Sequence, residues 1–299
     1  MDEQKIEFRK VRDFGQVLSD TFQFIKQELK PLLTTFLAIG GFFILTSGIM
    51  GGIYQDNTFS SIFKELQTKS AENSFINKNP FDDFLSPTYF LLLFLSILSW
   101  LVTRVVLAVY VKLYVENNNL SPTVDAVWSK TFRYLIPIFF YSIVLLILVS
   151  IGTLFCLLPG IWLMVVFAPI NLIFIVEDAS LSSGINRCFY IIKDNFWNSF
   201  GVYIIAYLIY VVSSSVISLI IGSIAGLASY FTTGDVSKTV GIVTGVLDIF
   251  SQVMYIIFFV AIALQYYSLV EIKDGNGLLS RLQTVGNSNT SNSETEEQY

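Results

Sequence analysis

Histidine is absent from this chain of 299 residues, and only two cysteines are present. Histidine is the commonest general base and the commonest protein ligand of transition-metal ions, so its absence removes most acid–base and metal-dependent catalytic sites. The sequence also lacks a P-loop, a Cys-x-x-Cys pair and a nucleophile elbow. We therefore expect no catalytic residue, no cofactor and no metal site, and a protein that is not an enzyme.

Charged residues are also scarce, at 14% of the chain, whereas 54% of the residues are hydrophobic and mean hydropathy is +0.64. A soluble domain carries about 25% charged residues, so this chain has too little polar surface to cover itself in water. Apolar residues gather in runs of about 20, which match the roughly 30 Å hydrocarbon core of a bilayer. The six runs are residues 32–54, 89–111, 138–158, 160–176, 200–221 and 247–270. The sequence thus predicts an all-α polytopic membrane protein with six transmembrane helices.

The basic residues are distributed unevenly between the two sides of such a protein. With six spans both termini share one side; 13 of the 18 basic residues fall there, four lie in the opposite loops, and Arg104 lies inside a span. Because cytoplasmic loops are enriched in Lys and Arg, this asymmetry places both termini in the cytoplasm. We expect one membrane domain at residues 1–280, with an outer polar loop at 55–88, and a disordered cytoplasmic tail at 281–299.

An amphipathic stretch precedes a pair of apolar segments three times, beginning at Arg12, Ser121 and Leu181. Apolar residues recur in these stretches at helical spacing. An amphipathic helix directly before a span is suited to lie in the headgroup plane, with its apolar face in the acyl boundary. The sequence therefore predicts a cytoplasmic interfacial helix before each pair of spans. The alternative is that these helices pack on the ends of the spans as ordinary protein core.

The second apolar segment of each pair ends in the same dipeptide. The three copies are Val115-Glu116, Val176-Glu177 and Val270-Glu271. Together with the amphipathic stretches they predict three helix-hairpin repeats, at about 12–115, 116–176 and 177–272. Each repeat holds an even number of spans, whereas the inverted repeats of alternating-access transporters require an odd number. The pattern therefore favours parallel repeats over a rocking transporter.

A group of short motifs occurs in the second and third repeats. They are Leu158-Pro159-Gly160-Ile161, Ala168-Pro169, Glu177 and Phe196-Trp197. Over about 50 residues this stretch resembles the membrane domain of glycerophosphoryl diester phosphodiesterases and its stand-alone relatives. The resemblance implies a bacterial cytoplasmic-membrane protein of a kind with no established activity. It does not imply phosphodiesterase activity, because the soluble catalytic barrel is missing and the family's catalytic histidines have no counterpart here.

Arg104 is the basic residue expected well inside a span. A charge at that depth is costly unless it snorkels to the interface or pairs, which makes it a candidate for function. Glu116, Glu177 and Asp178 are expected near the same end of the spans and would serve as its partners. With Glu271, these residues form the candidate set for contact with lipid headgroups or a substrate. For Arg104 itself, a structural anchor is the favoured role and such a contact is the alternative.

Prolines and small residues predict how the helices pack. Pro159-Gly160 predicts a tight outer turn between the third and fourth spans, and Pro169 predicts a kink in the fourth. Small residues four apart let helices approach closely. They occur at Gly48 and Gly52, at Gly241 and Gly245, and at Ser214, Ser218, Gly222 and Gly226. The expected partners are membrane lipids and, through these faces, helices of this chain, a second copy or another membrane protein, but not nucleic acid.

The leading functional hypothesis is a non-enzymatic membrane protein with a lipid-interface, structural or accessory role. The alternative is a transporter or lipid-translocating protein that uses Arg104 near an anionic substrate. Asp248 and Gln252, one helical turn apart near the outer end of the last span, would suit cation coupling if buried, although a position at the interface is the simpler expectation. An intramembrane enzyme is the third hypothesis, disfavoured because no pair of acids and no Ser/Lys dyad has a suitable spacing.

Overall fold

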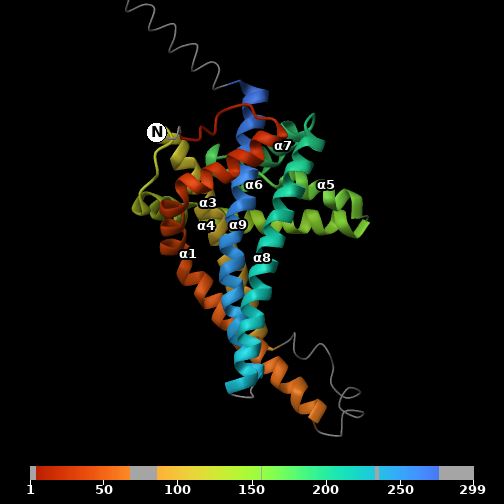
Figure 1. Cartoon of the computed structure of the whole chain (residues 1–299). Coiled ribbons are helices and arrows are strands. Elements are labelled where there is room, and N and C mark those ends of the chain that lie inside the picture. The colour runs from red at the N-terminus through yellow and green to blue at the C-terminus, as the bar shows by residue number, and fades with distance from the viewer. Residues whose placement is uncertain (1–4, 68–85, 156, 233–235, 276–299) are drawn as a thin grey trace, which may run out of the picture.

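A computed structural model describes residues 5–67, 86–155, 157–232 and 236–275 of the chain, and every regular element among them is a helix. The helices in chain order (Figure 1) are α1 (Phe14–Gln67), α3 (Pro87–Glu116), α4 (Val124–Phe155), α5 (Leu157–Phe167), α6 (Ile170–Val176), α7 (Leu181–Ile192), α8 (Phe196–Thr232) and α9 (Val236–Asp274). The prediction of an all-α chain is confirmed for these residues.

Six helical segments are long and apolar enough to cross a membrane by length and composition. They are Phe14–Gln55, Pro87–Glu116, Val124–Leu154, Leu157–Val176, Phe196–Ala228 and Val243–Asp274. Five of them contain one of the predicted apolar runs, and the third contains most of the run at 138–158, whose last residues lie beyond Leu154. The prediction of a polytopic membrane protein is therefore confirmed at this level. The fourth segment joins α5 and α6, and is therefore interrupted.

Helix α1 begins at Phe14 and contains the first amphipathic stretch and the first apolar run without a gap. Pro31 lies inside it, and proline removes a backbone hydrogen bond and bends a helix. Figure 1 shows the red start of α1 lying across one end of the bundle before the helix turns and runs along α9. The helix also continues to Gln67, so the first part of the stretch predicted as an outer loop at 55–88 is helical.

The turn predicted at Pro159-Gly160 is wrong. Helix α4 ends at Phe155 and α5 begins at Leu157, so both residues lie in the first turns of α5. Proline is tolerated there because the first helical N–H groups have no intrahelical partner. Gly160 instead allows α5 to pack closely on α4, since a Cβ atom built at this position would lie 2.9 Å from the Cα of Thr153.

Pro169 does more than kink the fourth segment, because it separates two helices. Helix α5 ends at Phe167 and α6 begins at Ile170, with Pro169 at the position before its first residue. Helix α7 follows after a short link and is separate from α8, unlike the first two amphipathic stretches, which are continuous with their spans. The hydroxyl of Ser180 caps α7 by accepting a hydrogen bond from the backbone N–H of Ser183 at 3.5 Å.

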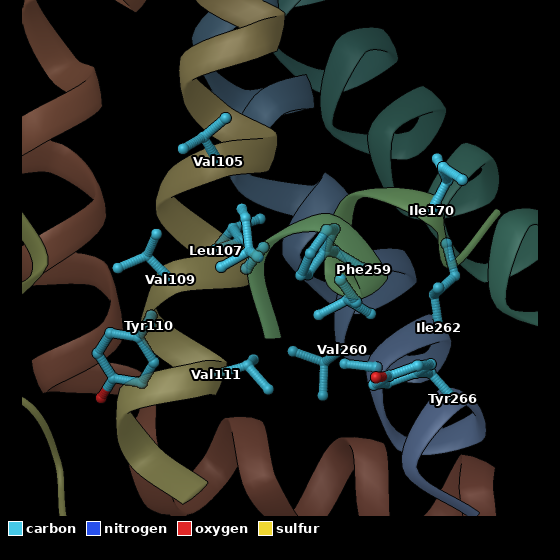
Figure 2. Packing of buried hydrophobic residues seen from close by; sticks show 14 of the residues in the cluster. Val105, Leu107, Val109, Tyr110, Val111, Ile170, Phe259, Val260, Ile262 and Tyr266 are labelled. Atoms are coloured by element: carbon cyan, nitrogen blue, oxygen red, sulfur yellow. The ribbon is translucent and has the colours of Figure 1, made fainter. Parts of the chain in front are cut away.

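The core is formed mainly by α3 and α9 with α1 and α6 packed around them. Figure 2 shows apolar side chains of α3, among them Leu107 and Val111, gathered beside Phe259 and Val260 of α9. All four are almost fully buried. This core lies in the half of the bundle that holds the start of α1 and the last turns of α9 (Figure 1).

The small-residue face predicted at Gly48 and Gly245 is confirmed as a contact between helices of one chain. A Cβ atom at Gly48 would lie 2.8 Å from the carbonyl oxygen of Gly245, and one at Gly245 would lie 2.5 Å from that of Gly48. The backbones of α1 and α9 therefore touch at this point. Gly222 and Gly226 of α8 differ, because nothing lies within 4 Å of a Cβ built there.

Candidate functional site

One end of the bundle gathers charged residues from distant parts of the chain. We call it the N-terminal face: it comprises residues 5–13, α7 and the last turns of α3, α6 and α9. Both the first described residues and the end of α9 lie at this end in Figure 1. The predicted residues Glu116, Glu177, Asp178 and Glu271 all belong to it, because they lie at or just after the ends of α3, α6 and α9.

Arg12 ties the N-terminal segment to the bundle. Its guanidinium is buried and donates to the carboxylate of Asp20 at 2.8 Å, to the carbonyl of Phe8 at 2.8 Å and to that of Lys10 at 3.1 Å. Its backbone N–H also donates to the Ser268 hydroxyl of α9 at 2.9 Å. The segment before α1 is thus held against the bundle by the contacts of a single buried cation.

Phe8 completes this attachment through an aromatic cluster. Its ring is fully buried and makes edge-to-face contacts with Phe24, Tyr114 and Tyr267, at centroid distances of 5.1, 5.7 and 5.4 Å. The hydroxyl of Tyr114 donates to the carbonyl of Ile6 at 3.2 Å. Edge-to-face pairs add to the energy of burial, so the N-terminal segment is part of the core that joins α1, α3 and α9.

Glu177 and Arg187 form the centre of an ion-pair network. The Nε of Arg187 donates to both carboxylate oxygens of Glu177, at 3.1 and 3.0 Å, and its terminal nitrogens bind Asp274. The Tyr266 hydroxyl donates to Glu177 at 2.8 Å. Hydrogen bonds to Asp274 and then to Glu177 raise the pKa of Arg187 above its ordinary value. The network links α6, α7 and α9 and leaves Glu177 little capacity for a ligand.

Lys112 and Asp178 form a second pair at the same face. The buried ammonium of Lys112 donates to the carbonyl of Ile175 at 2.6 Å, to Asp178 at 3.0 Å and to the Tyr134 hydroxyl at 3.2 Å. Partial burial would raise the pKa of Asp178, but the hydrogen bonds from Tyr134 and Lys112 outweigh it and lower the pKa. Lys112 therefore donates a hydrogen bond to a carbonyl at the C-terminal end of α6, and its ion pair with Asp178 holds the loop that follows.

The predicted pairing of Arg104 with these carboxylates is wrong. Glu177 binds Arg187, Asp178 binds Lys112, and Glu116 binds Lys130 at 3.1 Å. Arg104 is exposed although the α3 residues around it are buried, and it forms no hydrogen bond or ion pair with another residue in the described ranges. Glu116 lies 12 residues further along α3, about 18 Å at 1.5 Å per residue, which is beyond the reach of Arg104.

Glu271, the last predicted residue, is half-buried in α9. Three charged residues that are buried in the described part of the chain were not predicted: Arg12, Glu28 and Lys112. Glu28 accepts hydrogen bonds from the Tyr110 hydroxyl at 2.8 Å and from the Ser121 hydroxyl at 2.6 Å. The burial of Glu28 could be predicted in part, because Glu28 follows the buried residues of α1 at helical spacing. For Arg12 the sequence offers no signal, since its partners are mostly backbone carbonyls.

An aromatic groove lies where α5, α7 and the start of α8 meet. Two adjoining cavities of about 280 and 460 Å³ share Trp162 and Phe196. The remaining lining residues are Leu158, Pro159, Ile161, Val166, Phe189, Tyr190, Ile192, Lys193, Trp197 and Phe200. Apart from Lys193 and the Tyr190 hydroxyl, the lining side chains carry apolar or aromatic groups. The groove is thus suited to a long apolar molecule.

The polar end of this groove is cationic. Lys193 is exposed, and its ammonium forms no hydrogen bond or ion pair with any residue that the structure describes. The ring of Tyr190 lies under two further cations, with Arg187 and Lys273 at 5.6 and 5.5 Å from its centroid. These two already pair with Asp274 and Asp194, and the ion pair with Lys273 lowers the pKa of Asp194. Lys193 is therefore the cation available to an anionic ligand.

A separate polar cluster lies deep between α1, α3 and α9. The buried Gln252 exchanges hydrogen bonds with Ser99 at 3.0 and 3.1 Å, accepts one from Thr103 at 2.8 Å and donates to Asp248 at 3.2 Å. Asp248 also accepts from the Ser47 hydroxyl at 3.1 Å. Asp248 therefore takes part in helix packing and is not free at the interface. Polar side chains hold helices together in this way inside membranes.

Replacing Gln252 with leucine is expected to destabilise the protein by about 2 kcal/mol, because Ser99, Thr103 and Asp248 lose a buried partner. Unfolding in mixed detergent micelles measures this loss. The control is Thr46→Val, since the Thr46 hydroxyl bonds only to its own helix, at Phe42 and Phe43. Equal stability of the two variants would show that the cluster does not hold the helices together.

The described residues contain no group of three or more His, Cys, Asp or Glu side chains placed to hold a metal ion. The charged residues of the N-terminal face mostly pair with each other, whereas the aromatic groove and Lys193 are open. Comparison of the chain with protein-family models, with curated proteins and with solved structures gives no match.

Proposed function

We propose that this chain is a non-enzymatic multi-pass membrane protein that binds an anionic phospholipid in the aromatic groove, with a structural or accessory role in the membrane. One observation carries the proposal: an open apolar groove ends at Lys193, an exposed cation that has no partner among the residues the structure describes. An acyl chain matches the apolar lining, and a phosphate matches the ammonium group. A lipid satisfies both ends at once, whereas a soluble anion would leave the aromatic part empty.

The surroundings of the groove support a lipid as its occupant. Trp197 and Trp162 are exposed, at 79% and 44%, and tryptophan is typical of the membrane–water interface. Leu158, at the other end of the groove, is 75% exposed, which would be unfavourable in water. The groove would therefore open toward the lipid at headgroup level.

The proposal includes the orientation and the repeats expected from the sequence. The excess of basic residues near the termini would place the N-terminal face in the cytoplasm of a bacterial cell, beneath the cytoplasmic membrane. Pro31 in α1, Pro137 in α4 and the break between α7 and α8 lie between each amphipathic stretch and the long apolar helix after it. These breaks support three repeats in which the amphipathic part lies along the interface.

The described geometry does not favour the transporter alternative. A transport site would require Arg104 to line a path together with acidic partners, but Arg104 is exposed and the carboxylates bind other cations. The non-enzymatic assignment rests on the absence of histidine from the sequence. Release of product from a phosphodiester lipid by the purified protein would overturn it.

Replacing Lys193 with glutamine is expected to weaken binding of phosphatidylglycerol roughly tenfold, the loss of one hydrogen bond to a charged group. Binding of phosphatidylcholine should weaken less, because its choline cation offsets the charge of its phosphate. Replacing Trp162 with alanine is expected to weaken both lipids, because apolar contact is lost. Native mass spectrometry of the full chain in detergent with defined lipid mixtures measures both effects.

Two variants outside the groove serve as controls. Lys130→Gln removes a half-exposed lysine that pairs with Glu116, and Trp128→Ala removes a tryptophan that is 48% exposed, close to the value for Trp162. Both should retain lipids as the unmodified protein does. If all four variants behaved alike, the groove would not be the lipid site.

A further inference from the structure

The distal part of the α4–α5 hairpin projects from the bundle. Beyond Leu145 no residue of α4 is buried among those whose side chains are described, and Leu154, Leu157 and Leu158 near the tip are exposed by 85, 69 and 75%. The two helices contact each other closely at Gly152 and Gly160. The hairpin thus presents apolar side chains in most directions, and only its base is covered by protein.

The composition of the hairpin requires an apolar environment. No Asp, Glu, Lys or Arg occurs between Arg133 and Glu177. Exposed apolar surface of this extent is not stable in water, and helices satisfy their own backbone hydrogen bonds, so they can lie in hydrocarbon. Acyl chains of the bilayer are therefore the occupant that covers this surface.

The hairpin does not run along the neighbouring helix α8. Leu158 lies near the start of α5 and Val166 near its end, eight residues apart, which is about 12 Å along a helix. Over that length the facing part of α8 is confined to Phe196, Trp197 and Phe200, its first turns. Helix α5 therefore crosses α8 at one level, and Figure 1 shows α4 and α5 extending across the direction of α8 and α9.

The level at which α5 crosses α8 lies at the edge of the membrane, on the side of the N-terminal face. The first turn of α8 follows directly after the polar residues Lys193, Asp194 and Asn195. The apolar exposed surface of α8 continues over 24 residues from Ile204 to Leu227, a rise of about 35 Å, which is enough for the hydrocarbon core by itself. The α4–α5 hairpin therefore lies at the depth of one end of α8 and does not extend along the length of this helix.

We propose that the α4–α5 hairpin is embedded in a single leaflet, beneath the headgroups on the side of the N-terminal face, and that α1, α3, α8 and α9 cross the membrane. The occupant of its exposed surface is the acyl chains of that leaflet. Four crossings, like six, leave both ends of the chain on one side. Because the hairpin takes up area in one leaflet, it acts as a wedge. This inference requires a membrane environment but not the lipid site in the groove.

A fluorophore at the hairpin tip distinguishes the two topologies. Leu158→Cys is made in a Cys156→Ser, Cys188→Ala background, labelled with bimane in detergent and reconstituted with one orientation. Headgroup-spin-labelled phosphatidylcholine is then placed in one leaflet at a time. Thr88→Cys at the start of α3 and Asn117→Cys after its end report the two sides, because both residues are exposed. Leu154→Cys is the second tip position if Leu158→Cys does not fold.

The proposal predicts that the tip is quenched several-fold more strongly from the leaflet that quenches position 117 than from the leaflet that quenches position 88. Preference for the position 88 leaflet would show that the hairpin spans the membrane. Equal quenching from both leaflets would place the tip at the midplane and would also overturn the proposal. A tip protected from both quenchers would be covered by a second protein copy, which contradicts a lipid occupant.

Discussion

Replacing Arg12 with glutamine is expected to lower the free energy of unfolding by about 3–5 kcal/mol, the cost of removing one partner from a buried charged network. The variant leaves the Asp20 carboxylate without its cation, and the carbonyls of Phe8 and Lys10 lose their donors. Because the two carbonyls lie in the segment before α1 and Asp20 lies in α1, the attachment of residues 5–13 to the bundle should fail as a unit. Denaturant titration in mixed micelles measures the loss, and hydrogen exchange of residues 5–13 shows where it occurs.

The neighbouring Arg9→Gln is the matched control. Arg9 carries the same side chain three residues earlier, but it is exposed and forms no hydrogen bond or ion pair with another residue in the described part of the chain. Its replacement should change stability by less than about 0.5 kcal/mol, as is usual for surface positions. A similar loss in both variants would mean that Arg12 contributes only its charge and not its contacts.

Replacing Gly245 with alanine is expected to destabilise the protein by about 3 kcal/mol, near the upper end for overpacking a tight contact. The new methyl group would lie 2.5 Å from the backbone carbonyl oxygen of Gly48, and a backbone atom cannot move aside as a side chain would. Helices α1 and α9 would have to separate, which also strains the polar cluster around Gln252. The same titration measures the effect.

Gly222→Ala and Gly226→Ala test whether this effect comes from packing. Both positions lie in α8, where nothing is within 4 Å of the added atom. Alanine is a better helix former than glycine by up to about 1 kcal/mol, so these variants should be unchanged or slightly stabilised. If Gly245→Ala were as stable as these two, the contact seen between α1 and α9 would be incorrect.

The membrane class and the positions of the long helices could be predicted because they depend on composition and on the length of apolar runs. The helix ends at Glu116 and Glu177 coincide with the end of α3 and the residue after α6, as the repeated dipeptide indicated. The third copy does not mark a helix end, because α9 continues past Glu271 to Asp274. The partners of these residues could not be predicted. Arg187 joins Glu177 to Asp274, 87 residues away from Arg187, and no local pattern encodes such a contact.

The path of the chain after α4 could not be predicted from the sequence either. Proline marks either the end of a helix or its first turn, and the dipeptide Pro159-Gly160 does not distinguish the two. Similarly, the apolar stretch from Tyr134 to Val176 has the length and hydropathy of two spans. A hairpin lying across α8 has the same composition, so its direction is visible only in the structure (Figure 1).

The most direct test of the proposed function is a cryo-electron microscopy structure of the full chain in nanodiscs containing equal amounts of phosphatidylglycerol and phosphatidylcholine, with a bound antibody fragment as a marker. We predict density for a phospholipid whose phosphate lies at Lys193 and whose acyl chain follows Trp162, Phe196 and Phe200. The Lys193→Gln variant should lack the headgroup density. A groove that is empty, or filled by a helix of a second copy, would contradict the proposed lipid site.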